Sequence, residues 1–153
     1  MPDIIRTDSS NPDFIALVKL LDADLAHRDG ADNAYYAQFN KIDMLKNCVV
    51  VSVDGQAVGC GAFKPFEEGI SVEVKRMYVL ESYRGKGIAR QILTELEKWA
   101  GELKYCHCVL ETGKRQPEAI ALYSKHGYQI IENYGQYKGL ENSVCLQKQL
   151  APA

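Results

Sequence analysis

The spacing of hydrophobic residues changes clearly between Val72 and Gly101. From Val72 to Leu80 apolar and polar positions interleave and β-branched residues are frequent, which predicts a strand. The following hydrophobic residues recur at steps of three and four, which predicts a helix with one apolar face. That face comprises Ile88, Ile92, Leu93, Leu96, Trp99 and Ala100. Glycine commonly follows a helix, so we expect a strand, a short loop and a helix that stops at Gly101.

Upstream of this unit the pattern predicts a helix and a β-hairpin. Asn11 and Pro12 favour a helix start, because Asn caps a helix and Pro suits the first helical position. Asp54-Gly55 between two apolar runs is a strong hairpin signal. The expected elements are, in order, a strand at Asp3–Thr7, a helix from Asn11 to near His27, a short helix within Asp32–Leu45, strands at Cys48–Val53 and Gln56–Lys64, and a turn at Pro65–Gly69 before a strand at Ile70.

Downstream of the central helix the pattern predicts three strands and one helix. These elements are a strand at Lys104–Thr112, a helix from Pro117 to Gly127, and strands at Tyr128–Ile131 and Ser143–Lys148. A strand that follows a strand–helix unit is expected to be parallel to the first strand, because such crossovers are right-handed. We therefore predict an α/β fold, a single domain over residues 1–153. Its mixed sheet is antiparallel at the start, parallel at the centre and flanked by helices.

The composition is that of an ordinary globular protein. Of 153 residues, 46% are hydrophobic and 25% are charged, and the net charge is −2. This balance gives no case for nucleic-acid binding, and no apolar run approaches the roughly 20 residues of a membrane span. No basic flank and apolar core follow Met1, so we expect no signal peptide and a cytoplasmic location. We expect the five cysteines to be buried free thiols rather than disulfides or metal ligands.

The loop Arg84–Ala89 carries two glycines between the predicted strand and helix. Glycine lets the backbone approach a ligand, the first helical N–H groups lack intrahelical partners, and the positive end of the helix dipole attracts anions. Arg84 and Lys86 add positive charge. The loop is therefore either a phosphate-binding site or an ordinary tight helix start.

Two nucleotide-binding motifs fit this loop less well. A P-loop needs Gly-Lys followed by Ser or Thr after a four-residue spacer, and this is absent. A dinucleotide fingerprint would use Gly85 and Gly87, but Arg90 stands where its third small residue is needed. Glu111, near the end of the next strand, could imitate the acid that binds the ribose. A nucleotide-dependent oxidoreductase therefore remains an alternative.

Arg84-Gly85-Lys86-Gly87-Ile88-Ala89 resembles the Arg/Gln-x-x-Gly-x-Gly/Ala signature of the GNAT superfamily of acyl-CoA N-acyltransferases. Lys75–Val79 is similar to that family's fourth strand, and Gln116–Tyr128 resembles its Asn-x-x-Ala-x-x-Leu-Tyr-x-x-x-Gly-Phe pattern. Gln116 departs from the Asn of this pattern and Tyr128 from the Phe. The resemblance covers residues 49–150 well and the N-terminal part weakly. It implies that the two parallel strands splay apart and admit acetyl-CoA.

The resemblance also implies which residues hold acetyl-CoA. The loop would bind its phosphates through backbone N–H groups, and the preceding strand would bind the pantetheine amides through main-chain groups. The N–H of Met77 would polarise the thioester carbonyl. The implied residues are Met77, Tyr78, Val79, Arg84, Gly85, Lys86, Gly87, Ile88, Ala89, Gln116 and Tyr123.

Acylation of an amine needs a base for the amine, and an acid can protonate the departing thiolate. Tyr123 matches the position of the family's frequent general acid, and a phenol with a pKa of about 10 is protonated at neutral pH. Glu73 matches the glutamate that serves as base in some members that acetylate histones. Glu111 is the second candidate base and His107 the third. Tyr123 could instead be a core residue, and Glu73 could instead pair with Lys75.

The acceptor is expected to be the primary amine of a small molecule, such as an amino acid or a related anionic compound. Arg76 or Lys75, which lie on opposite faces of their strand, would contact its anionic group. Lys41, beside Phe39, would approach it as well, and Tyr35 and Tyr36 would line an apolar wall. Solvated or ion-paired charges are the alternative. A domain that binds acyl-CoA without turnover, and an enzyme that acts on a protein or peptide amine, also remain possible. We expect a monomer or homodimer without nucleic-acid or membrane partners.

Overall fold

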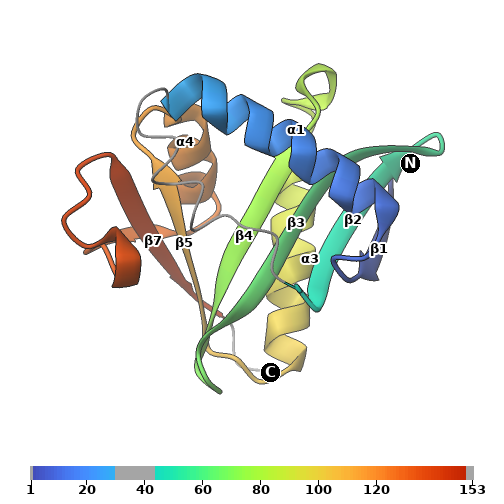
Figure 1. The fold of residues 1–153 in the computed structure, drawn as a ribbon. Helices are drawn as coiled ribbons and strands as arrows, with labels where there is room; N and C mark the ends of the chain where they lie inside the picture. Colours follow the sequence, from blue (N-terminus) through green and yellow to red (C-terminus); the bar gives the residue numbers. More distant parts are fainter. Residues whose placement is uncertain (1, 30–43, 151–153) are drawn as a thin grey trace. The chain divides into compact units, whose positions relative to one another are not determined.

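The computed structural model describes residues 2–29 and 44–150, which form the predicted mixed α/β fold (Figure 1). Seven strands pair in the order β1-β2-β3-β4-β5-β7-β6. The chain divides into two compact units, Met1–Lys64 with Lys75–Leu96 and Pro65–Val74 with Glu97–Ala153. Strands β3 and β4 and helix α3 contribute residues to both units. No helix in the described ranges is both long enough and apolar enough to cross a membrane.

The first unit holds the antiparallel start of the sheet. It contains β1 (Asp3–Thr7), α1 (Pro12–Asp29), β2 (Asn47–Val53), most of β3 (Gln56–Glu67), the end of β4 (Ser71–Val79) and the start of α3 (Ile88–Glu102). β2 pairs antiparallel with both β1 and β3. Asp54 and Gly55, with φ of 52° and 82°, connect β2 to β3. Two successive residues with positive φ suit a tight hairpin, so the predicted hairpin is confirmed.

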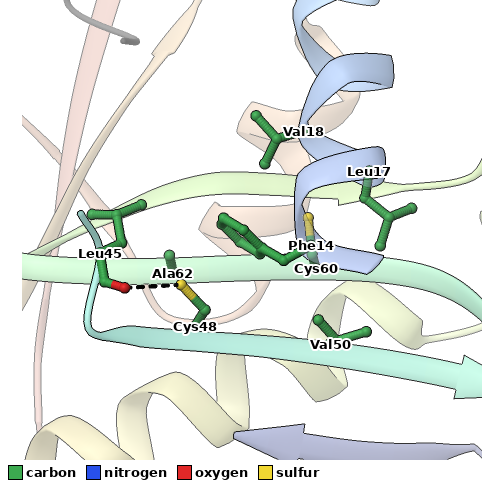
Figure 2. Packing of buried hydrophobic residues seen from close by; sticks show 8 residues of the cluster. All are labelled: Phe14, Leu17, Val18, Leu45, Cys48, Val50, Cys60 and Ala62. Atoms are coloured by element: carbon green, nitrogen blue, oxygen red, sulfur yellow. Dashed lines mark hydrogen bonds between the residues drawn. The ribbon is translucent and has the colours of Figure 1, made fainter. Parts of the chain in front are cut away.

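Helix α1 packs on one face of β2 and β3 (Figure 1). It begins where the sequence predicts, because the side-chain oxygen of Asn11 accepts hydrogen bonds from the N–H groups of Asp13 and Phe14, at 2.9 and 3.0 Å. Alternate residues of the two strands face the helix. The buried cluster, drawn in Figure 2, comprises Phe14, Leu17, Val18, Leu45, Cys48, Val50, Cys60 and Ala62.

Helix α3 packs on the opposite face of β3, where two glycines give it room. A Cβ on Gly61 would lie 2.6 Å from the Met77 sulfur and 2.7 Å from Cγ2 of Ile92. A Cβ on Gly59 would lie 3.0 Å from Cδ1 of Ile92. These two positions therefore require glycine for space. The predicted apolar face of α3 is confirmed for its five buried residues, whereas Trp99 is only half-buried; the buried ones are Ile88, Ile92, Leu93, Leu96 and Ala100.

Strand β3 is longer than the sequence predicts, because Pro65 lies within it. The pairing of β3 with β2 ends at Phe63, so β2 needs no N–H from Pro65. A proline is tolerated at such a position, since it lacks only the N–H. The turn expected at Pro65–Gly69 was therefore placed too early. The strand continues to Glu67, and Gly69, with φ of 74°, lies in the short turn before β4.

The second unit holds the rest of the sheet. It contains the ends of β3 and α3, the start of β4, β5 (His107–Gly113), α4 (Pro117–Lys125), β6 (Gln129–Ile131) and β7 (Ser143–Gln149). β7 pairs antiparallel with β5 and with β6, so it lies between them. Helix α4 starts at Pro117 as predicted, and Gly127, with φ of 97°, follows its end.

Helix α3 does not stop at Gly101. Its C-terminus is closed by Lys104, which has a φ of 73°. The N–H of Lys104 bonds to the carbonyl of Gly101 at 2.9 Å, and the N–H of Tyr105 to the carbonyl of Ala100 at 3.1 Å. This is a Schellman motif with lysine where glycine is usual. The strand expected from Lys104 consequently begins only at His107.

The parallel pairing of β4 with β5 is short. In the described residues it covers three positions, in which Ser71, Val72 and Glu73 match His107, Cys108 and Val109. β5 pairs with β7 along its whole length, from His107 to Gly113. The ladder between β4 and β5 therefore stops well before the end of either strand, as expected for a splayed parallel pair.

Four of the five cysteines are buried free thiols, as predicted. They are Cys48, Cys60, Cys108 and Cys145. Burial raises the pKa of Cys48, Cys60 and Cys108 to about 12, so these thiols remain neutral and pack as small apolar side chains. Cys106 differs from the expectation, because it is exposed in the turn before β5.

A polar network joins the end of α3 to α4 and β7. One oxygen of Glu97 lies 2.8 Å from the Lys148 ammonium. The other accepts a hydrogen bond from the Tyr128 hydroxyl at 3.0 Å and lies 3.3 Å from Nε2 of His126. The Glu97 side chain is only 12% exposed, so these partners replace much of the water that an ionised carboxylate would lose on burial.

We expect Glu97→Gln to lower the free energy of unfolding by about 1–3 kcal/mol, because it leaves the Lys148 charge without its carboxylate partner. Urea unfolding followed by circular dichroism measures the change. Glu95→Gln is the matched control on the same helix. A carboxylate oxygen of Glu95 lies 2.7 Å from Nε of Arg6, but these two side chains are more exposed, at 24% for Glu95 and 31% for Arg6. We therefore expect Glu95→Gln to lower the free energy of unfolding by only about 0.5 kcal/mol. Equal losses in both variants would contradict this account.

Candidate functional site

The loop before α3 combines two left-handed glycines with a helix N-terminus. Gly85 and Gly87 have φ of 77° and 83°, a region that other residues rarely adopt. The first hydrogen bond of α3 runs from the N–H of Gln91 to the carbonyl of Gly87, at 3.1 Å. The N–H groups of the residues between them therefore precede the helical ladder. They lie at the positive end of the helix dipole.

The space beside these two glycines is open. A Cβ added at Gly85 or Gly87 would meet no described atom within 4 Å. Backbone conformation therefore requires glycine here, whereas at Gly59 and Gly61 the packing of α3 requires it. A loop that bends in this way, with open space beside it, lets an anion reach the first N–H groups of the helix.

Arg84 braces this loop against β4. Its Nε donates a hydrogen bond to the carbonyl of Val79 at 2.8 Å, and its guanidinium lies 5.4 Å from the centroid of the Tyr78 ring. Its Nη2 lies 3.9 Å from a carboxylate oxygen of Asp24 on α1. Asp24 thus partly neutralises the positive charge of Arg84. Lys86, which is exposed, supplies the other positive charge of the loop.

The regular pleat of β4 is interrupted at Arg76. This residue has φ of 61°, and its carbonyl accepts a hydrogen bond from the Cys60 thiol at 3.3 Å. A non-glycine residue in this conformation costs about 1 kcal/mol or more, and such residues cluster at functional sites. Beyond it, the Met77 side chain reaches the α3 face at Gly61, whereas Tyr78 packs with the cluster beneath α1. Their backbone groups therefore lie in the plane of the sheet.

The side chain of Arg76 lies against α1. Its Nη1 is 3.6 Å from Oδ1 of Asp22, and it is 3% exposed, whereas Asp22 is 46% exposed. Burial raises the pKa of Asp22, and the guanidinium acts against this rise. Arg76, which the sequence predicted to contact the acceptor, thus lies beside the carboxylate of Asp22. Four of the other residues predicted to contact the acceptor lie outside the described residues; these are Tyr35, Tyr36, Phe39 and Lys41.

In the second unit, Glu73 and Glu111 lie on one face of the sheet. Glu73 is in register with Val109, and Glu111 follows two positions later on β5, so the three side chains point the same way. Glu111 is in register with Cys145 of β7. Burial, followed by the charges of Glu111 and Glu73, raises the pKa of Cys145 to about 11. Both predicted candidate bases therefore lie on the face of the sheet that carries Cys145.

Two tyrosines that the sequence analysis did not select lie beside these carboxylates. The Tyr134 hydroxyl donates a hydrogen bond to Oε2 of Glu73 at 2.8 Å, and Glu73 is 3% exposed. The centroids of the Tyr134 and Tyr137 rings are 5.7 Å apart. Burial and then Glu73 raise the pKa of Tyr134; burial, Glu111 and then Glu73 raise that of Tyr137. The only sequence signal is two tyrosines three positions apart in a glycine-rich connection.

Tyr123, the predicted general acid, lies on α4 and is 7% exposed. Its ring contacts Tyr128 edge to face, with 5.9 Å between centroids. Burial and then the Glu111 charge raise the pKa of Tyr123, which keeps its hydroxyl protonated at neutral pH. Gln116, the predicted pantetheine contact, immediately precedes α4. Tyr123 can therefore act as a proton donor in this environment.

Comparison with known proteins identifies the family. The model of the GNAT acetyltransferase family matches residues 14–128, so the chain belongs to this family. A solved structure from Klebsiella pneumoniae, assigned to the acyl-CoA N-acyltransferases, has a TM-score of 0.82 and 31% identity, covering 99% of both chains. A family acetyltransferase from Elizabethkingia anophelis, solved with acetyl-CoA bound, has a TM-score of 0.69 and 18% identity, covering 97% of this chain and 98% of its own. At 18% identity, the match to the Elizabethkingia anophelis structure shows a shared fold alone.

Relatives found by sequence carry acetyltransferase names. IAA acetyltransferase of Azospirillum brasilense is 37% identical over 102 residues, which is 67% of either chain. The N-acetyltransferase YjgM of Escherichia coli is 36% identical over 85 residues, 54% of this chain and 51% of the relative. The matched part thus spans about half to two thirds of these relatives. The chain is an acetyltransferase, and its family uses acetyl-CoA as acyl donor.

We expect Gly87→Glu to abolish acetyl-CoA binding while the fold is retained. The new side chain has open space, so the fold loses only the roughly 1–2 kcal/mol of a left-handed non-glycine residue. Its carboxylate would repel phosphates at the start of α3. Titration calorimetry with acetyl-CoA measures the affinity.

Gly55→Glu is the matched control for this experiment. Gly55 has a φ of 82°, against 83° for Gly87, and equally open surroundings, but it lies in the β2–β3 hairpin. We expect its affinity for acetyl-CoA to equal that of the unmodified protein. A similar loss of affinity in both variants, or in neither, would contradict a phosphate site at the start of α3.

Proposed function

We propose that this acetyltransferase transfers an acetyl group from acetyl-CoA to the primary amine of a small molecule. In the proposed reaction the amine attacks the thioester directly in a ternary complex. The observation that carries the proposal is the start of α3, where two left-handed glycines with open space beside them precede the first helical N–H groups. This geometry suits the phosphates of acetyl-CoA. Binding of these remote groups supplies energy that orients the reacting thioester.

In this proposal the cofactor is held by backbone more than by side chains. The loop N–H groups bind the phosphates, with Lys86 as the nearby charge, while Arg84 acts by keeping the loop on β4. The in-plane backbone groups of β4 bind the pantetheine arm, to which Gln116 adds an amide. The N–H of Met77 follows the irregular Arg76 and polarises the thioester carbonyl. The proposed cofactor contacts are Met77, Tyr78, Val79, Arg84, Gly85, Lys86, Gly87, Ile88, Ala89, Gln116 and Tyr123.

The proposed chemistry uses one base and one acid. Glu73 removes a proton from the amine, which as an ammonium has no lone pair for attack. Glu111, on the same face of the second unit, is the alternative base. Tyr123 protonates the departing thiolate; burial raises its pKa, so its hydroxyl is protonated at neutral pH and available as a donor.

We propose an acceptor that carries an anionic group, such as an amino acid. An N-acetylaspartate synthetase of Danio rerio is 34% identical over 107 residues, 69% of this chain and 36% of the relative. Its name specifies a product that is an acetylated amino acid. Arg76 would have to share its guanidinium between Asp22 and the acceptor. Lys41, Phe39 and Tyr36 are the other proposed acceptor contacts.

A screen for amine-dependent release of CoA tests the function. Amino acids, polyamines, aminoglycosides and peptide N-termini are each mixed with protein and acetyl-CoA, and free thiol is measured. We expect release with a small-molecule amine, together with an acetylated product of the expected mass. Tight acetyl-CoA binding with thioester hydrolysis alone would instead identify a binding domain without transfer activity.

We expect Tyr123→Phe to lower kcat by about 100-fold or more, because it removes the proposed acid while keeping the ring that packs against Tyr128. The KM for acetyl-CoA should change much less. Steady-state kinetics at saturating substrates, across a range of pH, measure the effect. A variant with unchanged kcat at every pH would remove Tyr123 from the mechanism.

Removal of the acceptor's negative charge tests the anionic contact. With acetyl-CoA fixed, an accepted amino acid is compared with its amide and its methyl ester. We expect kcat/KM for the free acid to be at least about tenfold higher, as one charge-assisted hydrogen bond would provide. An amide or ester that reacts equally well or better would show that the acceptor site does not recognise a carboxylate.

A further inference from the structure

The connection between β6 and β7, residues 132–142, is held in a defined conformation. The Asn133 side-chain amide donates hydrogen bonds to the carbonyls of Leu140 and Ser143, both at 3.1 Å. Within the connection, the N–H of Tyr137 bonds to the carbonyl of Tyr134 at 2.9 Å. These bonds fix the backbone on both sides of Tyr134. The backbone of Tyr134, and with it the base of its side chain, therefore has a fixed position in the second unit.

The Tyr134 ring is also packed on two sides. It meets Phe66 edge to face, with 4.7 Å between centroids, and Tyr137 at 5.7 Å. Its hydroxyl ends 2.8 Å from Oε2 of Glu73, to which it donates. The extension of β3 through Pro65 brings Phe66 into this arrangement.

We propose that Tyr134 is a positioning residue, which fixes the orientation of the Glu73 carboxylate. The inference rests on the proposed function, in which Glu73 accepts the proton of the amine. A hydrogen bond to a carboxylate is short and directional, so the Tyr134 hydroxyl holds Oε2 of Glu73 in one place.

Three other groups lie near Glu73 in the second unit. Glu111 on β5 lies on the same face of the sheet. Cys145 on β7 remains a neutral thiol, since its pKa is raised to about 11. Tyr137 from the same connection also has a raised pKa and adds no positive charge. The hydrogen bond from Tyr134 therefore offsets part of the cost of a buried carboxylate.

Tyr134 keeps its proton throughout the proposed reaction. The ammonium first gives one proton to Glu73. The N–C bond then forms as the C–S bond breaks, Tyr123 protonates the departing thiolate, and the second proton lost by the nitrogen restores the Tyr123 hydroxyl. The raised pKa of Tyr134 is consistent with a hydroxyl that donates a hydrogen bond without losing its proton. The residue thus acts through Glu73 and does not itself exchange a proton with the substrate.

The variant Tyr134→Phe removes the hydroxyl and keeps the ring between Phe66 and Tyr137. Tyr128→Phe is the matched control, because its hydroxyl also donates to a glutamate of the second unit, the half-buried Glu97, at 3.0 Å. Both variants lose one hydrogen bond of the same kind, so a merely structural role of Tyr134 would give the two the same result.

The first measurement needs no acceptor. The side-chain ¹³C carboxyl resonance of Glu73, assigned with Glu73→Gln, is compared at neutral pH between the unmodified protein and the two variants. We expect this resonance to move in Tyr134→Phe, because the carboxylate loses a hydrogen-bond donor, and to keep its position in Tyr128→Phe. An unchanged resonance in Tyr134→Phe, or an equal change in both variants, would overturn the proposal.

The second measurement is kcat/KM at neutral pH with an amine from the screen. We expect it to fall about tenfold in Tyr134→Phe, at an unchanged KM for acetyl-CoA, and to stay unchanged in Tyr128→Phe. A changed carboxyl resonance with unchanged kinetics would show that Tyr134 contacts Glu73 without a part in transfer, which overturns its positioning role. If Glu73→Gln retains full activity, the assignment of the base fails instead.

Discussion

The backbone at the start of α3 has to pass through the left-handed region twice within three residues, and only glycine does so without strain. Gly85 and Gly87 provide this bend at positions where no neighbouring side chain would block a larger residue. The bend sets where the first N–H groups of the helix point. Arg84 holds the loop to β4 through the Val79 carbonyl. The phosphate site proposed here thus depends on backbone geometry, with charge in a supporting role.

The second unit concentrates ionisable groups on one face of its sheet. Register places Glu73, Glu111 and Cys145 there, and the connection after β6 adds Tyr134 and Tyr137. A buried carboxylate needs hydrogen-bond donors to remain ionised, and tyrosine supplies a donor that stays neutral. The hydrogen bond from Tyr134 to Glu73 is such a contact, and it fixes the orientation of the carboxylate.

The sequence predicted those features that depend on local rules. The alternation of apolar and polar residues predicted β4, and apolar residues at steps of three and four predicted α3. Asn11 and Pro12 predicted the start of α1. It failed where tertiary contacts decide. Pro65 lies within a strand because β2 ends before it, and Lys104 closes α3 in place of Gly101.

The candidate site was predictable to a similar degree. Its loop has a glycine pattern that can be read directly, and Glu73 and Glu111 occupy alternating positions on predicted strands. Tyr134 could not be found in this way. Its role depends on a hydrogen bond across 61 positions of the chain and on a connection without periodic structure. The paired environment of Arg76 also follows only from the position of Asp22 on α1.

The central claim is that the start of α3 binds the phosphates of acetyl-CoA. Backbone ¹⁵N–¹H resonances of Gly85, Gly87, Ile88 and Ala89 report on this directly. A titration with CoA is compared with one using pantetheine, which has the same thiol arm but no diphosphate. We predict that CoA shifts these four amides more than the amides of the β2–β3 hairpin, and that pantetheine leaves them unchanged. Loop amides that do not respond to CoA, or that respond equally to pantetheine, would contradict the claim.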